Sequence, residues 1–174
     1  MSLALLEQDI PGLAARVRTL STTELRALAR AAAQLALYVS PVDDRRLEIG
    51  WAALASDSQT LRRDASEQLQ QLVDELDDVA ARLQVQLDPL QEQGEAPERL
   101  AVLAAGYDRE FGQARARETL LAALEPILDQ AVAGALYETN AALDHAPAAI
   151  SALVDAVADG VPDPAQMVVR QLRL

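Results

Sequence analysis

The densest group of side chains capable of chemistry is a run of four carboxylates, Asp74, Glu75, Asp77 and Asp78. Carboxylates four residues apart on a helix, such as Asp74 and Asp78, share a face and can bind a divalent cation or oppose a basic protein surface. A hard-cation site needs further oxygens from a turn or a second helix, and no EF-hand loop is present. We therefore interpret the run first as a solvated helix face, then as a partner-binding site for a basic protein, and last as a metal site.

The single histidine, His145, follows Asp144 and is the only side chain that ordinarily titrates near neutral pH. A neighbouring carboxylate can orient a histidine as a base, but adjacent residues on a helix point about 100° apart. The pair also stands shortly before Pro147, where a turn or a helix cap is expected. The residue three before the histidine is Ala142, so the Glu-x-x-His pattern of a di-iron site is missing. We predict a surface or capping histidine.

The composition excludes several classes of enzyme. The chain has no cysteine and no lysine, and all 15 of its cations are arginines. Thiolate nucleophiles, thiolate zinc sites, disulfides, Walker lysines and Schiff-base lysines are therefore absent. The serines lie in neither the Gly-x-Ser-x-Gly nor the Ser-x-x-Lys context that activates a nucleophile, and no dinucleotide-binding fingerprint occurs. We expect no catalytic residue, no metal and no cofactor.

The few aromatic residues fit packing better than ligand binding. Trp51, the only tryptophan, shares an apolar stripe with Leu47 and Leu54. Tyr107 and Phe111 are four residues apart, a spacing that brings two side chains together on a helix. We interpret both groups as packing residues rather than as an aromatic cage for a cation.

Apolar residues recur with a helical period along nearly the whole chain, and no stretch alternates as a strand would. The clearest helix start is a capping box, in which the Ser21 hydroxyl accepts from a backbone amide and Glu24 reaches back. Pro41 ends this helix, because proline disfavours helical geometry in the residue before it. A second helix opens at 42–44, and within it Gly50 indicates the close approach of a neighbouring backbone.

The longest helix is predicted over about 58–88 and is stopped by Pro89. Its leucines fall in an arc about 100° wide, opposite the acidic residues. The heptad-like spacing from Leu69 to Leu83 is too short to define a coiled coil, so we expect a helical hairpin instead. The stretch 90–97 is the predicted bend of that hairpin.

Further breaks are predicted at Pro126, at 144–147 and at Gly160, and Pro164 can occupy the first turn of a short terminal helix. No repeat of fixed period and no low-complexity linker is present. We therefore predict one all-α domain over residues 1–174, a bundle of about seven or eight helices with a long central helical hairpin.

The net charge of −12 is concentrated in one segment. Residues 64–98 hold ten acids against Arg82 alone, whereas residues 1–63 are almost neutral. We expect the basic spots Arg45-Arg46 and Arg62-Arg63 to pair with nearby acids. An anionic surface repels nucleic acids and anionic membranes, and no export or membrane segment is visible. The expectation is a cytoplasmic protein that binds neither nucleic acid nor membrane.

The stretch 28–54 combines an alanine-rich helix, a break from Ser40 to Asp44, and Arg45-Arg46-Leu47 leading into Trp51-Ala52-Ala53-Leu54. This stretch resembles helical segments in immunity proteins of bacterial polymorphic toxin systems. The resemblance covers under a sixth of the chain and carries over no functional residue. It implies a cytoplasmic acidic protein that blocks a toxin by surface complementarity.

The sequence thus favours a non-enzymatic acidic helical protein that binds another protein, as an immunity or adaptor protein. The partner would have a basic surface. The acidic segment would steer this partner by charge, and an apolar helix face would then anchor it. One alternative is a self-assembling structural protein, a homo-oligomer in which the Leu69–Leu83 stripe pairs between chains. The other is an enzyme that uses carboxylates alone or with a divalent metal.

Overall fold

The computed structural model describes residues 3–41, 43–56, 58–92 and 97–173. Within these residues every regular element is an α-helix, so the predicted all-α class is confirmed. The first helix is a single turn, and the other eight are longer. In chain order the helices are α1 (Leu3–Leu6), α2 (Leu13–Arg18), α3 (Thr22–Val39), α4 (Arg45–Leu54), α5 (Gln59–Glu92), α6 (Pro97–Ala123), α7 (Leu128–Ala142), α8 (Pro147–Ala158) and α9 (Pro164–Leu172).

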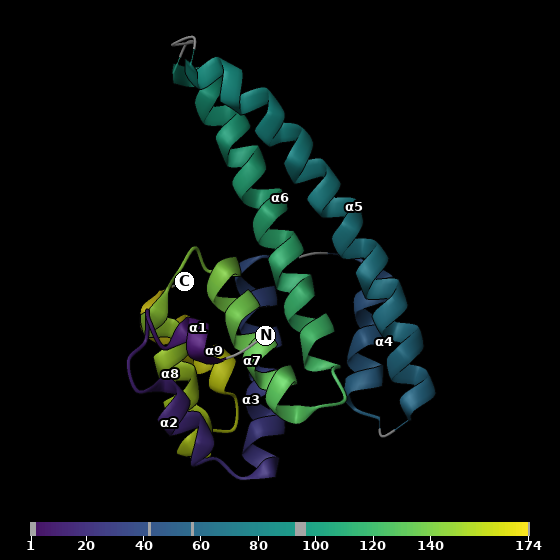
Figure 1. Ribbon diagram of the computed structural model, residues 1–174, viewed down its shortest axis with the longest axis vertical. Coiled ribbons are helices and arrows are strands. Elements are labelled where there is room, and N and C mark those ends of the chain that lie inside the picture. Colours follow the sequence, from purple (N-terminus) through teal and green to yellow (C-terminus); the bar gives the residue numbers. More distant parts are fainter. Residues whose placement is uncertain (1–2, 42, 57, 93–96, 174) are drawn as a thin grey trace.

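The helices α5 and α6 pack against each other as a long hairpin, whose far end projects beyond the other helices (Figure 1). The base of the hairpin is surrounded by the rest of the chain, with α4 beside α5 and with α3 and α7 beside α6. The predicted helical hairpin is therefore confirmed. Of its predicted bend at 90–97, residues 90–92 belong to α5, Pro97 begins α6, and residues 93–96 lie outside the described residues.

The prediction that Pro89 stops α5 is wrong, because the helix continues to Glu92. Proline cannot donate a backbone hydrogen bond to the carbonyl four residues earlier, here that of Val85. Pro89 and Val85 both lie on the exposed side of the helix, with the Val85 side chain 71% exposed. Water can therefore satisfy the carbonyl that the proline leaves free.

Two main apolar clusters, a larger and a smaller one, and a minor third one made of Ala36, Ala116 and Ala142 hold the body together, and α3 contributes to all of them. The larger cluster joins α3 to α1, α2, α7, α8 and α9. Its large, fully buried side chains are Leu6, Leu13, Leu28, Leu35, Val132, Leu136, Ile150, Leu153 and Val154. The smaller cluster joins α3 to α4, α5 and α6 through Leu47, Leu69, Leu72, Leu120 and Leu124.

The helix α3 can serve both clusters because its buried face is rich in alanine. Ala32 is fully buried, and its carbonyl lies 3.1 Å from the Thr139 hydroxyl of α7. The same hydroxyl lies 2.7 Å from the Ala135 carbonyl within α7. Such a contact between a side chain and the backbone of a neighbouring helix requires the two helices to lie close together, which small side chains allow.

Most of the predicted helix boundaries are confirmed. The Ser21 hydroxyl accepts from the Glu24 amide at 3.3 Å, and the Glu24 carboxylate accepts from the Ser21 amide at 2.6 Å. Pro126 separates α6 from α7, while Pro147 and Pro164 are the first residues of α8 and α9.

The close approach predicted at Gly50 is made by side chains rather than by a backbone. A Cβ atom at Gly50 would lie 2.8 Å from Leu120 Cδ2 and 2.9 Å from Leu69 Cδ1. The absence of a side chain at this position lets α4 pack closely against these two leucines of the smaller cluster.

The leucine stripe of α5 should contribute unequally to stability along its length. Leu69 is fully buried at the base of the hairpin, whereas Leu83 is only half-buried in the projecting part. We expect Leu69→Ala to lower the free energy of unfolding by about 2–5 kcal/mol, and Leu83→Ala to cost less than about half of that. Urea unfolding followed by circular dichroism measures both; equal losses would contradict the assignment of Leu69 to a closed core.

Candidate functional site

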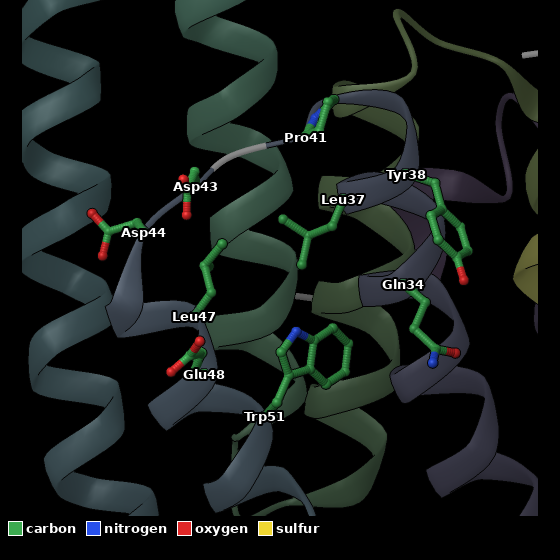
Figure 2. A pocket seen from close by; sticks show the side chains of 9 residues that line it. All are labelled: Gln34, Leu37, Tyr38, Pro41, Asp43, Asp44, Leu47, Glu48 and Trp51. Carbon is green, nitrogen blue, oxygen red and sulfur yellow. The ribbon is translucent and has the colours of Figure 1, made fainter.

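A pocket of about 440 Å³ lies between α3 and α4 and is called here the α3–α4 groove (Figure 2). Among the described residues that line it, two are aromatic, three are acidic and none is basic. The lining residues are Gln34, Leu37, Tyr38, Pro41, Asp43, Asp44, Leu47, Glu48 and Trp51. The groove therefore combines apolar walls with an excess of negative charge.

The groove exists because α4 packs on α5 and α6 rather than along α3. Leu47, Gly50 and Ala53 are the buried residues of α4. Trp51 packs against the edge of the smaller cluster, as expected of a packing residue, and its remaining surface lines the groove. In Figure 2 the Trp51 ring and Leu37 lie between the two helices.

Asp44 stands at the end of the groove where α4 begins. Its carboxylate accepts from the Arg46 amide at 2.8 Å as an N-cap, and it pairs with the Arg46 guanidinium at 2.9 Å. The contact with the Arg46 side chain is the main reason why the pKa of Asp44 is lowered. The predicted helix start at 42–44 is confirmed for Asp44, whereas Val42 lies outside the described residues.

Asp43 and Glu48 are the carboxylates of the groove that remain available. Both are exposed, and neither forms an ion pair with a residue that the structure describes. Tyr38 is 51% exposed and Trp51 is half-buried, so both rings present surface at the groove. Carboxylates next to exposed aromatic rings attract a cationic side chain by charge and by cation–π contact.

The four carboxylates of the predicted partner-binding run do not share one environment, because two of them bind arginines of the chain itself. Glu75 accepts hydrogen bonds from Arg46 at 2.8 and 3.0 Å. That contact is the main reason why the pKa of Glu75 is lowered. Asp77 is 44% exposed but faces α6, and both its oxygens lie 2.5 Å from Arg115.

Asp74 and Asp78 form the outward half of the run. Both lie exposed on α5, and Asp74 accepts a hydrogen bond from Gln70 at 2.8 Å. Neither carboxylate pairs with a cation in the part of the chain that the structure describes. These two residues therefore form a solvated helix face that is free to meet a partner.

Arg115 links three helices at the base of the hairpin and was not singled out from the sequence. From α6 its guanidinium binds Asp77 of α5 and Glu118 of its own helix. It also lies 3.4 Å from Glu138 of α7, and its Cζ atom lies 5.2 Å from the centre of the Phe111 ring. Burial opposes the charged form, but the hydrogen bond to Asp77 and the nearby glutamates raise the pKa of Arg115 overall.

The two glutamates beside Arg115 are held in an environment that disfavours their charged form. Burial and, next, the neighbouring Glu118 together raise the pKa of Glu138 to about 7, against the attraction of Arg115. Burial likewise raises the pKa of Glu118. We call Arg115, Asp77, Glu118 and Glu138 the buried ionic cluster. It holds α5, α6 and α7 together and opens into no pocket among those described.

Arg117 is a second buried arginine on α6, with only 2% of its surface exposed. Its Nη1 donates to the Gln113 carbonyl at 2.7 Å, while its buried Nε has no hydrogen-bond partner. Burial lowers its pKa to about 10, partly offset by Asp44. The spacing of Arg115 and Arg117 was the available sequence signal. Residues two apart point to nearly opposite sides of a helix, so at least one of the two should face the body if one side of the helix packs against it.

The other residues considered for chemistry have structural roles. His145 is exposed in a left-handed conformation with φ 58°, and its amide donates to the Asn140 carbonyl at 2.8 Å. This contact closes the C-terminal end of α7, so the capping interpretation is confirmed. Tyr107 and Phe111 stack with their ring centres 5.8 Å apart, so they are the predicted packing pair.

In the described ranges, no group of three or more histidine, aspartate or glutamate side chains is placed to hold a metal ion. The helices in these ranges also include none that is long and apolar enough to cross a membrane. None of the protein-family models, curated proteins or solved structures compared with this chain matches it.

The buried ionic cluster predicts an unusual dependence of stability on pH. A folded-state pKa of about 7 for Glu138, against 4.5 for an ordinary glutamate, means that the folded chain binds the proton more tightly. The free energy of unfolding should therefore fall as pH rises from about 4.5 to about 7, by about 3 kcal/mol from this residue.

Glu138→Gln removes the titrating group and should flatten this part of the pH profile. The matched control is Glu67→Gln, at a side chain that is 63% exposed. Urea unfolding at a series of pH values measures the slope for each variant. An unchanged slope in Glu138→Gln would show that Glu138 is ionised in the folded protein throughout this range.

Proposed function

We propose that this chain is a non-enzymatic binding protein that receives a basic segment of another protein in the α3–α4 groove, as an immunity or adaptor protein. The observation that carries this proposal is the lining of the groove. Two aromatic rings and three carboxylates meet there, with no cation among the described lining residues. A partner that supplies arginine or lysine side chains matches the negative charge of this lining and can form cation–π contacts with its aromatic rings.

The first support is long-range electrostatics. A net charge of −12 attracts a basic partner before contact, and the exposed Asp74 and Asp78 add to the field on α5. Such attraction speeds association and weakens at high ionic strength. It selects the sign of the partner's charge but does not determine where the partner docks.

The second support is the local chemistry of the groove. Asp43 and Glu48 are exposed and form no ion pair with the described residues, so they can accept hydrogen bonds from a guanidinium. Trp51 and Tyr38 offer ring faces to the same group, and arginine stacks well on aromatic rings. Leu37 and Leu47 supply the apolar surface against which the stem of a long basic side chain can lie.

A second candidate function is contact between copies of this chain through the projecting part of the hairpin. Val85 on α5 is 71% exposed there, and Val102 on α6 is 73% exposed. The Leu69–Leu83 stripe is a poor candidate for such pairing, because Leu69 and Leu72 are already buried within one chain. Light scattering over a range of concentrations distinguishes a dimer from a monomer.

The proposal can be tested with a short peptide of alternating arginine and glycine, monitored by tryptophan fluorescence. Trp51 is the only tryptophan, so the signal reports on the groove alone. We expect a saturable change in emission with an affinity that falls as salt is added. A glutamate–glycine peptide of equal length should cause no change. No response to the arginine peptide at low salt would overturn the proposal.

A pair of double variants locates the contact. Asp43→Asn with Glu48→Gln should weaken binding of the arginine peptide by about tenfold, since each partly exposed charge contact contributes on the order of 1 kcal/mol. Asp74→Asn with Asp78→Asn removes the same charge from α5 and should weaken it by less than about threefold. If the second pair matters as much as the first, the partner docks on α5 rather than in the groove.

A further inference from the structure

A second pocket, of about 460 Å³, is lined by α3, the ends of α4 and α6, the start of α5, and the connection into α7. Its charge is opposite to that of the α3–α4 groove. Arg26 and Arg30 of α3 and Arg62 of α5 line it, and Glu125 is the only acid among its described lining residues. Three arginines from two helices therefore meet at one cavity in a chain whose net charge is −12.

The arginines of this pocket are not neutralised by acidic residues within the described part of the chain. The chain has 27 acidic residues for its 15 arginines, so partners are abundant. Nevertheless Arg26 and Arg30 are exposed and form no ion pair with the residues that the structure describes. Arg62 is half-buried, and its Nε donates to the Ser56 carbonyl at 3.1 Å, which fixes the side chain and leaves its two terminal nitrogens available.

The positions of the two arginines on α3 allow both side chains to bind the same ligand. Arg26 and Arg30 are four residues apart and therefore neighbours on one face of the helix. The guanidinium group presents a planar fork of donors that matches the oxygens of a phosphate or a carboxylate. Gln59 adds a neutral side chain with both donor and acceptor atoms to the same wall.

Apart from Glu125, the rest of the described lining is apolar. Leu54 ends α4, Leu128 begins α7, and both belong to the partly buried side chains that pack against the clusters. A volume of about 460 Å³ lies within the range of pockets for small organic ligands, which bury most of the ligand against apolar surface and orient it with a few polar groups.

We infer that this pocket binds a small organic anion, with a phosphate or carboxylate head held by Arg26, Arg30 and Arg62 and an apolar body resting on Leu54 and Leu128. The strongly negative whole-chain charge works against a polyanion such as nucleic acid, but one compact anionic head needs only the local arginines. This site is independent of the α3–α4 groove, because the two pockets share no lining residue.

Isothermal titration calorimetry with hexyl phosphate, hexanoate and inorganic phosphate tests the inference. We expect at least one of the two hexyl ligands to bind about tenfold or more tightly than inorganic phosphate, because the hexyl chain adds apolar contact. Binding should weaken as salt is added. Tighter binding of hexyl phosphate identifies a phosphate site, and tighter binding of hexanoate a carboxylate site. No detectable binding of either hexyl ligand overturns the inference.

The variant Arg26→Gln with Arg30→Gln should lower the affinity by about tenfold or more, and both positions are exposed, so folding should be retained. The matched control is Arg63→Gln, next to Arg62 but outside the pocket, where Arg63 pairs with Glu67 at 3.1 Å. The control should bind within about twofold of the unmodified chain.

Equal binding by the double variant overturns the inference. A concentration-dependent dimer that the double variant loses would also overturn it, since the arginines would then contact a second copy.

Discussion

The arrangement of this molecule depends on the packing of α6. Over its C-terminal half this helix is covered by α3, α4, α5 and α7, so side chains that would face water on a surface helix are enclosed. Arg115 is one of them, and it finds its partners on the two flanking helices, Asp77 and Glu138. Burying a charge without a partner is costly, so these contacts restrict how the hairpin can sit on the body. The orientation of α5 relative to α7 is set by this arginine as well as by leucines.

The fold could largely be predicted from the sequence, because its signals are local. A capping box at Ser21, prolines at helix ends and a leucine period along α5 each act within one or two turns of helix. Pro89 was misjudged because the cost of a proline depends on whether water can reach the carbonyl it leaves free. That condition depends on which side of α5 the following helix α6 covers, which is a tertiary contact rather than a local signal.

The candidate sites were much harder to predict, since each is made by residues from several helices. The run from Asp74 to Asp78 looks uniform in sequence, but two of its carboxylates are bound by Arg46 and Arg115 from distant positions. The α3–α4 groove combines residues around a short connection whose local pattern indicated only a helix break. The charge of a segment is readable from its composition, whereas its availability depends on where the arginines of other helices lie.

The two pockets carry charges of opposite sign, which the net charge of the chain does not reveal. Cations and acids are both abundant in the first 63 residues, and folding sorts them into an acidic groove and a basic pocket on opposite ends of α3. The helix α3 also contributes to both of the main apolar clusters. A single alanine-rich helix thus packs in both clusters and borders both candidate sites along its length.

The projecting hairpin in Figure 1 has a thermodynamic consequence. Beyond the body its leucines are covered by one neighbouring helix only; Leu87 is buried between α5 and α6, but Leu83 and Leu103 stay half-buried. Local opening costs little free energy where few apolar contacts are lost. Amide protons in the projecting parts of α5 and α6 should thus exchange with solvent through local opening, while those of α3 exchange only when the whole body opens. Cooperativity therefore increases along the long axis of the molecule, from the projecting parts of α5 and α6, which can open separately, to α3, which opens last.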